Sequence, residues 1–427
     1  MKRSARPSCC RTLLLFFLAS TLAATAAPDL KIAPDDWPWW RGPTRDGEAA
    51  TGQNPPTTFS NAENVIWKAP VPGRGHASPT VVGKHVFLAT ADDEARTLSV
   101  LAYDRKTGKQ LWAKEVFSGG FPEKIHKKNT HASATCASDG HHVFAIFYND
   151  RKVQVVALDF EGKIAWKKGV GPFEPKKYEF GYGASPLLYK DWLVVVGDQA
   201  EGGFLAALDR GTGDIAWRIK RPADINYASP TVATIDGKDQ LLIGGAGQIS
   251  SYDPLTGKLA WAAKDTCPQT CGTLVADGGL IFSSGGYPRK ETIAVKADGS
   301  GTIVWQNKRK CYEQSMLAHK GFVYAIDDGG ILYCWRGKDG EEMWRERFGG
   351  PVSTSPVLVG DRIYAANEQG KFIVYKATPE KFEKLAENRL GDEAFATPAF
   401  CGNRIYARAT HLDGDQRNEF LYCLGNE

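Results

Sequence analysis

Short apolar runs alternate with polar positions along the chain, and a tight turn interrupts them about every 8–12 residues. The segment from Thr80 to Ala89 shows the pattern, with two apolar runs on either side of Gly83-Lys84. Glycine, asparagine and aspartate tolerate the positive φ of hairpin turns, so the pattern predicts a two-stranded hairpin. Seven further copies surround Asp139-Gly140, Lys190-Asp191, Asp236-Gly237, Asp277-Gly278, Lys320-Gly321, Gly360-Asp361 and Gly402-Asn403. The chain therefore carries eight predicted hairpins.

A second phrase recurs between the hairpins. It reads Asp104-Arg-Lys-Thr-Gly108-Lys-Gln-Leu-Trp112, and it returns at Asp209–Trp217 and Asp253–Trp261. Degenerate copies end at Trp166, Trp305, Trp344 and Leu385, and Trp67 ends a copy whose beginning is missing. The endings are spaced roughly 40–50 residues apart, which is the length of a propeller blade.

Eight hairpins and eight strand endings give eight units of two hairpins each. The sequence therefore predicts an all-β fold, an eight-bladed β-propeller of four-stranded antiparallel blades. The last unit, with strands in Pro398–Ala407 and Glu419–Leu424, lacks a final strand, which Asn64–Trp67 can supply. We expect the N- and C-terminal strands to pair in one blade and close the ring.

The repeated phrase has a physical basis. The aspartate carboxylate can accept hydrogen bonds from the amides of the following turn, and the glycine supplies positive φ. The tryptophan then reaches the outer edge of the blade, where its apolar face can cover the next blade. We expect blade packing, not substrate binding, from Trp67, Trp112, Trp166, Trp217, Trp261, Trp305 and Trp344.

The N-terminus has the pattern of a secretory signal. Four basic residues (Lys2, Arg3, Arg6 and Arg11) precede an apolar core at Leu13–Leu18, and small residues follow at Ala23–Ala27. We predict a signal peptide at 1–26, a lead segment at 27–63 and the propeller at 64–427. The protein is expected to be exported to the periplasm or the extracellular space, with no transmembrane segment.

Charge excludes one class of partner. The net charge of +4 arises in the predicted signal, because removing its four basic residues leaves 53 − 4 = 49 basic against 49 acidic residues. A neutral mature protein does not suggest nucleic-acid binding. We expect a monomer that binds a protein or a small anionic or aromatic ligand.

The D-x-x-T-G-x-x-x-W phrase occurs with Ala-Ser-Pro at Ala77–Pro79, Ala184–Pro186 and Ala228–Pro230. Together they resemble the pyrroloquinoline-quinone (PQQ) repeat of quinoprotein dehydrogenases and of non-enzymatic relatives that include the BamB family. The opening Trp37–Gly47 also resembles the segment that introduces many secreted PQQ-like propellers. The resemblance implies the fold, but function in a propeller depends on its loops.

The quinoprotein enzymes imply a disulfide between adjacent cysteines, a tryptophan beneath the cofactor, calcium held by acidic and amide groups, and an aspartate base. Here the only adjacent cysteines, Cys9-Cys10, lie in the predicted signal, and the haem motif C-x-x-C-H is absent. We therefore predict a binding module with no catalytic residue, metal or cofactor. One alternative is an oxidoreductase using PQQ and calcium; another is an envelope protein-assembly scaffold resembling BamB.

Three cysteines occupy related loops: Cys267, Cys271 and Cys311. In an exported protein a disulfide within this trio is favoured over a metal site, because no histidine lies nearby in the sequence. The pairing cannot be deduced from the sequence.

Two loops, Phe117–Ala132 and Lys168–Ala184, are much longer than their counterparts and mix lysine with aromatic residues. Long loops on a rigid scaffold often carry function. We expect a ligand or partner face formed by Arg74, His76, His126, Lys127, Lys128, His131, Tyr178, Tyr182, Tyr227, Tyr287 and Arg289. The alternative is that these loops only pack over the channel and solvate their lysines.

Overall fold

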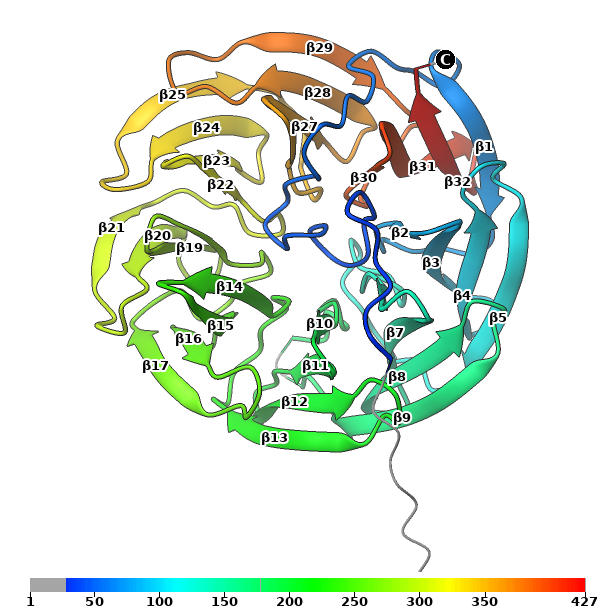
Figure 1. Cartoon of the computed structure of the whole chain (residues 1–427), viewed down its shortest axis with the longest axis horizontal. Coiled ribbons are helices and arrows are strands. Elements are labelled where there is room, and N and C mark those ends of the chain that lie inside the picture. The colour runs from blue at the N-terminus through cyan, green and yellow to red at the C-terminus, as the bar shows by residue number, and fades with distance from the viewer. Residues whose placement is uncertain (1–27, 177, 427) are drawn as a thin grey trace, which may run out of the picture.

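The computed structural model describes residues 28–176 and 178–426, and every regular element in these ranges is a β-strand. The strands form eight four-stranded antiparallel sheets arranged as a ring (Figure 1), which confirms the predicted eight-bladed propeller.

The blades are numbered in chain order, and each begins with its innermost strand. Blade 1 contains β2 (Thr80–Val82), β3 (His85–Asp92), β4 (Thr97–Asp104) and β5 (Gln110–Ser118), and blade 2 contains β6 (Ala137–Ser138), β7 (His142–Asn149), β8 (Lys152–Asp159) and β9 (Ile164–Pro172). Blade 3 contains β10 (Leu187–Tyr189), β11 (Trp192–Gly197), β12 (Gly203–Asp209) and β13 (Ile215–Arg221), and blade 4 contains β14 (Thr231–Ile235), β15 (Lys238–Gly245), β16 (Gln248–Tyr252) and β17 (Leu259–Lys264).

Blade 5 contains β18 (Val275–Asp277), β19 (Leu280–Gly285), β20 (Glu291–Lys296) and β21 (Ile303–Asn307), and blade 6 contains β22 (Leu317–His319), β23 (Phe322–Ile326), β24 (Ile331–Arg336) and β25 (Glu342–Arg347). Blade 7 contains β26 (Val357–Val359), β27 (Arg362–Ala366), β28 (Lys371–Lys376) and β29 (Lys384–Arg389), and blade 8 contains β30 (Ala399–Cys401), β31 (Arg404–Asp413), β32 (Gln416–Gly425) and β1 (Val65–Val71).

Burial differs between the strands of a blade because neighbouring blades cover the middle strands more completely than the outer strand. The two middle strands, such as β3 and β4, face a neighbouring blade on both sides and are buried along almost their whole length. The outer strand β5 lies at the rim and buries few of its side chains. The core is therefore the set of apolar layers between adjacent blades, as expected for sheets that are covered on both faces.

The ring closes through blade 8. Strand β1 pairs antiparallel with β32, with Trp67 opposite Cys423 and Val71 opposite Glu419. Figure 1 shows the blue β1 beside the red β32. This confirms that strands from the two ends of the propeller share one sheet.

At five of the seven repeated tryptophans the indole N–H links one blade to the next. The Trp112 indole N–H donates to the carbonyl of Phe160 (2.8 Å), and the Trp344 indole N–H donates to Thr378 (2.8 Å) in the corresponding turn. Gly108 adopts φ 72°, and a Cβ there would lie 2.6 Å from the ring of Trp67. Glycine is thus required both by the backbone conformation and by the close approach of the tryptophan.

A second set of links surrounds the channel. One hydroxyl residue precedes each innermost strand, and we call the set the hydroxyl ring: Ser78, Thr135, Ser185, Ser229, Thr273, Ser315, Ser355 and Thr397. At six junctions the backbone N–H donates to the hydroxyl of the next blade, as Ser315 does to Ser355 Oγ (2.9 Å). The serines of the Ala-Ser-Pro motif therefore join blades, which the sequence analysis did not anticipate.

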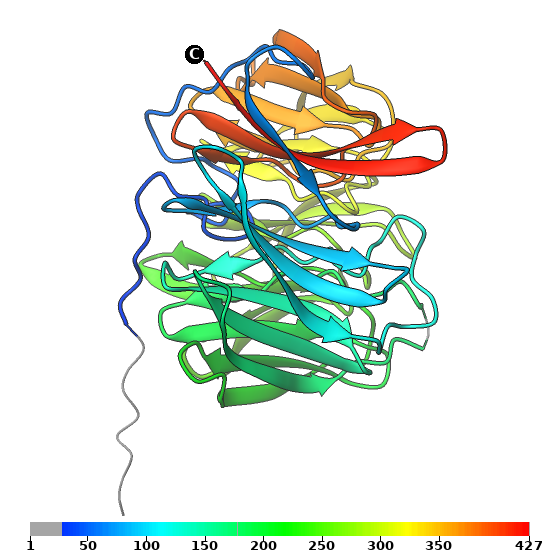
Figure 2. The ribbon, with the colours of Figure 1, turned by 90° about the vertical axis from the view of Figure 1, so that its right-hand side faces the viewer.

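The lead segment lies across one end of the channel (Figures 1 and 2). Its backbone pairs with blade 1 at Trp37 and Val81, and with blade 7, where Ala49 N–H donates to Leu358 (2.8 Å). Arg41 is 1% exposed and donates to the carbonyls of Pro356 and Met316. Contacts with several blades place this segment as a plug on the face that carries the hairpin turns.

The predicted signal peptide, 1–26, lies outside the described residues. Within the described ranges, no helix has the length and hydropathy needed to span a membrane.

Candidate functional site

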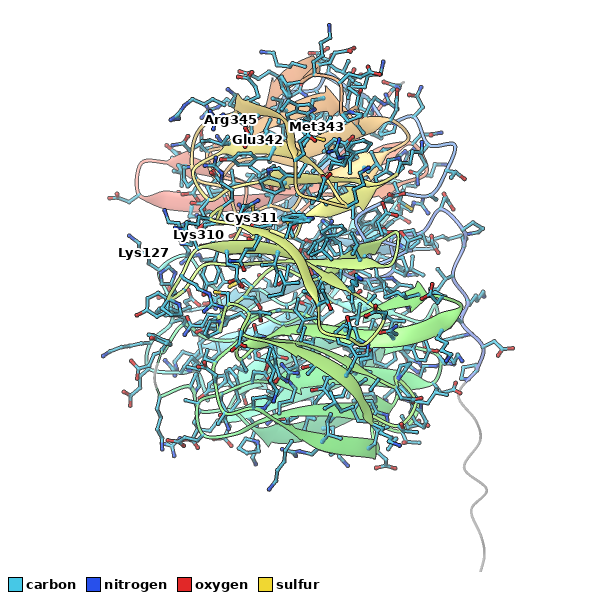
Figure 3. All side chains as sticks on the ribbon, turned by 90° about the vertical axis from the view of Figure 1, so that its left-hand side faces the viewer. Lys127, Lys310, Cys311, Glu342, Met343 and Arg345 are labelled. Carbon is cyan, nitrogen blue, oxygen red and sulfur yellow. The ribbon has the colours of Figure 1, made fainter. Side chains whose placement is uncertain are left out.

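The face opposite the lead segment carries the loops that lead into each innermost strand, here called the inner-strand loops. The two longest run over 119–136 and 173–186, because β5 and β9 extend further than the sequence suggested. Figure 3 shows Lys127 and Lys310 on this side, away from the lead segment. A cavity of about 480 Å³, here called the central cavity, opens between the loops.

The floor of the central cavity combines the plug with the hydroxyl ring. Trp40 of the lead segment lines the cavity, and its indole N–H donates to Thr273 Oγ1 (2.8 Å). Five members of the ring also line it: Ser78, Thr135, Ser185, Ser229 and Thr397. The floor is therefore an aromatic ring surrounded by small hydroxyl groups.

His76 forms part of the wall and stacks on Phe395, with ring centroids 4.3 Å apart and planes at 8°. Burial lowers the His76 pKa well below its usual value, and the guanidinium groups of Arg74 and Arg408 lower it further. A hydrogen bond to the backbone of Lys128 acts in the opposite direction but does not restore the pKa. His76 is therefore neutral, and its Nε2 has no partner among the described residues.

Tyr227 also lines the cavity, with its ring stacked on Phe180 at 6.1 Å. Burial raises the pKa of the phenol, so the hydroxyl stays protonated, and this hydroxyl has no partner among the described residues. Cys271 and Tyr312 complete this wall. Burial, together with Glu313, raises the pKa of the Cys271 thiol, which keeps it protonated and weakly nucleophilic.

The charged groups of the lining neutralise one another. Lys128 Nζ lies 2.6 Å from Glu368 and 3.5 Å from Glu313, and Lys310 lies 3.0 Å from Asp328. Burial would lower the Lys128 pKa, but its hydrogen bond to Glu368 and the two carboxylate charges raise it. The Ser353 hydroxyl lies within hydrogen-bond distance of both carboxylates beside Lys128 and donates its one proton to either of them. Lys128 thus already has its counterions and offers little attraction to an anion.

The structure brings some of the predicted face together. His76, His126, Lys128 and Tyr227 line the central cavity. Tyr178 and Tyr287 form an edge-to-face pair on its rim, with centroids 5.7 Å apart, and Tyr287 is 50% exposed. Lys127 is exposed on the loop 119–136.

The other four residues of the predicted face have local partners. Tyr182 is buried and donates to the carbonyl of Val196 (2.8 Å), and His131 packs on Phe121. Arg289 is paired with Glu291 (2.8 Å). Arg74 is held by backbone hydrogen bonds to Ala91. None of these four lines the central cavity.

The cysteine trio differs from the expectation. Cys267, Cys271 and Cys311 are all free thiols in the structure, so the disulfide favoured from the sequence is not formed. The Cys267 thiol instead contacts the backbone carbonyls of Tyr287 (3.2 Å) and Arg289 (3.3 Å). Among the described residues, no group of three or more His, Cys, Asp or Glu could hold a metal ion.

Sequence reasoning missed Trp40, Phe395 and Tyr312, and also the carboxylates that neutralise the lysines. Their loops lie at equivalent places in different repeats, so aligning all eight inner-strand loops would have brought Phe395 and Tyr312 forward. Nothing in the repeat predicts Trp40, because the lead segment lies outside it.

Comparison with known proteins agrees with the fold. In sequence, the chain is similar to outer membrane protein assembly factor BamB of Moranella endobia, 23% identical over 350 residues, which cover 78% of this chain and 82% of that protein. It is also similar to a polyvinylalcohol dehydrogenase of a Pseudomonas species, 25% identical over 80% of this chain and 57% of the enzyme.

Two solved structures share the architecture. BamB of Moraxella catarrhalis has a TM-score of 0.60 at 15% identity and covers 84% of this chain and 99% of its own. Quinohemoprotein alcohol dehydrogenase of Comamonas testosteroni has a TM-score of 0.62 at 13% identity and covers 92% and 81%. The sequence profile described as outer membrane protein assembly factor BamB matches residues 57–118, 99–346 and 289–380. Because these segments span most of the chain, the protein belongs to this family of PQQ-repeat propellers.

Proposed function

We propose that this protein is an exported, non-catalytic propeller scaffold that binds a partner protein at the rim of the central cavity. Membership of the BamB family supports a protein-binding role, since three of the curated relatives carry the name of an outer-membrane assembly factor. The proposed location is the periplasm, with the chain delivered there by the segment 1–26.

The observation that carries the proposal is a group of aromatic side chains on the rim, here called the aromatic rim: Tyr178, Phe180, Tyr227 and Tyr287. Tyr178 packs on Phe180 (5.6 Å) and on Tyr287 (5.7 Å), and Phe180 stacks on Tyr227. Tyr287 is 50% exposed and the other three rings are half-buried. Accessible tyrosines on a fixed backbone are typical anchors of protein interfaces, because they bury a large area at little cost in side-chain entropy.

The loop that carries Tyr178 and Phe180 is tied to the neighbouring long loop. Asn129 Nδ2, from the loop 119–136, donates to the carbonyl of Phe180 in the loop 173–186 (2.6 Å). The Asn129 carboxamide oxygen in turn accepts the Ser133 hydroxyl at 2.6 Å. A surface held in this way needs little reorganisation on binding.

Two observations favour binding over chemistry. His76, one of the two histidines that line the cavity, lies near arginines rather than beside a carboxylate, and the Cys271 thiol is kept protonated. Neither residue therefore has the partner that would activate it as a base or nucleophile.

The alternative, a PQQ- and calcium-dependent oxidoreductase, fits the described residues poorly. PQQ carries carboxylates, and both lysines of the cavity lining are already paired with acidic side chains. Titration of the purified protein with PQQ and calcium, followed by absorbance, discriminates the two: no saturable spectral change is expected, and micromolar binding would favour the enzyme.

Site-specific crosslinking tests the scaffold proposal. A photoreactive phenylalanine at Tyr287 on the rim is compared with one at Leu259, which is equally exposed (50%) but lies on the outer strand β17. In envelope preparations of the source organism, position 287 is expected to crosslink to a component of outer-membrane protein assembly. The proposal fails if position 287 yields no such adduct, or if both positions give the same adducts.

A further inference from the structure

The lining of the central cavity leaves polar atoms without partners. Nε2 of His76, Oγ of Ser78 and the hydroxyl of Tyr227 are buried and form no hydrogen bond among the described residues. Ser78 is 3% exposed, and all three residues line the same cavity. Buried polar atoms are almost always paired, so these three mark places where a ligand or water supplies the missing partner.

The chemistry of the three atoms is complementary. Neutral His76 carries one donor and one acceptor ring nitrogen, so its unpartnered Nε2 can take either role depending on the tautomer. The protonated Tyr227 hydroxyl is a donor, and the Ser78 hydroxyl can do either. A matching ligand must carry groups that can both donate and accept hydrogen bonds, which is the property of hydroxyl groups.

The charged side chains that line the central cavity are already paired, which disfavours binding of an ionic ligand. The carboxylates of the lining already have partners: Glu368 and Glu313 contact Lys128 and Ser353, while Asp328 contacts Lys310 and accepts from the Tyr312 amide (2.8 Å). A charged ligand would have to break one of these pairs or be buried without a counterion, and both are costly.

The size of the central cavity and its aromatic lining narrow the chemical class of the ligand further. Trp40 on the floor, Phe395 behind His76 and Phe180 beside Tyr227 offer aromatic faces, while the hydroxyl ring supplies small polar groups between them. Sugar rings combine apolar C–H faces with a hydroxyl periphery. A volume of about 480 Å³ is within the usual range for a small-molecule site.

We propose that the central cavity is a binding site for a neutral sugar, a mono- or disaccharide unit held between the aromatic faces. Its hydroxyls hydrogen-bond to His76 Nε2 and accept from the Tyr227 hydroxyl, with Ser78 as the third contact. This inference does not depend on the scaffold function, because it concerns the interior of the cavity and an isolated protein.

Binding is tested with the purified mature protein by saturation-transfer NMR. The probes are glucose, galactose, mannose, N-acetylglucosamine and maltose, with glucuronate and glucosamine as charged counterparts. At least one neutral sugar is expected to bind with millimolar or better affinity, and the charged analogues about tenfold more weakly. Failure of all five neutral sugars, or tighter binding of a charged one, would overturn the proposal.

Variants locate the sugar in the cavity. Tyr227→Phe and, separately, Ser78→Ala remove an unpartnered hydroxyl without removing any hydrogen bond within the protein, so both should fold; each is expected to weaken binding about tenfold. The matched control is Tyr189→Phe, whose hydroxyl donates to Asp239 (2.8 Å) beside a pocket lined by residues of the lead segment. Equal affinities in the Tyr227, Ser78 and Tyr189 variants would contradict the assignment.

Cys271 gives an independent readout, because its partly exposed thiol lines the cavity while the other described cysteines are buried. Saturating sugar is expected to slow maleimide labelling of Cys271 about tenfold, since a site that is mostly occupied reacts only through its free fraction. An unchanged rate would place the sugar elsewhere. The rim variant Tyr287→Ala should keep sugar binding even if it loses the protein partner, which separates failure of this inference from failure of the scaffold proposal.

Discussion

Replacement of Arg41 by methionine is expected to loosen the plug that closes the channel. The Arg41 guanidinium donates to the carbonyls of Pro356 (2.9 Å), Asp46 (2.8 Å) and Met316 (2.8 Å), so it joins the lead segment to blades 6 and 7. Methionine has a similar length and fills the space, but it leaves three carbonyl groups without their donor.

The magnitude follows from two opposing effects. Hydrogen bonds that involve a charged group contribute about 1.5–3 kcal/mol each. Burial opposes them by disfavouring the charged guanidinium, and it lowers the Arg41 pKa to about 10, equivalent to about 3 kcal/mol. The net loss on substitution is therefore about 3 kcal/mol, a large part of the stability of an ordinary domain.

Urea unfolding followed by tryptophan fluorescence measures the global effect, and limited proteolysis measures release of the lead segment. Arg41→Met should lower the unfolding midpoint and make residues 28–63 sensitive to protease before the blades unfold. The matched control is Arg345→Met on the outer strand β25, where the side chain is 61% exposed and lies 3.5 Å from Glu342 (Figure 3). Exposed ion pairs contribute little, so this control should unfold like the wild type. Coincident curves for Arg41→Met and the wild type, with an equally resistant lead segment, would refute the plug argument.

Three further outcomes follow from the described contacts. Truncation that removes residues 421–427 deletes the buried end of β32, so melting temperature and solubility should both fall sharply; an unchanged melt would contradict ring closure through blade 8. Gly108→Ala should destabilise more than Gly83→Ala, by about 1–3 kcal/mol in urea unfolding, because both glycines have positive φ but only the first has a tryptophan ring against its Cα. For Asp139, burial favours the neutral form, but hydrogen bonds from His142, the amide of His141 and Arg210 outweigh it and lower the pKa to about 2. The Asp139 carboxylate should therefore contribute about 2 kcal/mol above pH 4 that is lost as the pH falls toward 2. Asp139→Asn should flatten this part of the stability profile, and a parallel profile would show that the carboxylate is not responsible.

The sequence by itself determined the architecture, because every blade of a propeller repeats the same short-range interactions. Each hairpin turn, aspartate-capped turn and tryptophan is specified within one repeat, so counting repeats gave the number of blades. The missing strand of the last repeat also identified the closing pair, β1 with β32, since a four-stranded blade needs its fourth strand. The aromatic character of the rim was accessible in the same way, from long loops with tyrosine and phenylalanine.

What only the tertiary structure decided is the character of the central cavity. The basic loop 119–136 suggested an anionic ligand, yet Lys128 meets Glu368, which lies 240 residues further along the chain. The plug escaped prediction for a related reason: the lead segment has no repeat or periodicity, and its conformation is set by carbonyl groups from blades 6 and 7. A ring brings eight distant loops to one axis, so the charge and hydrogen-bonding capacity of its centre depend on all eight at once, and no local pattern can report them.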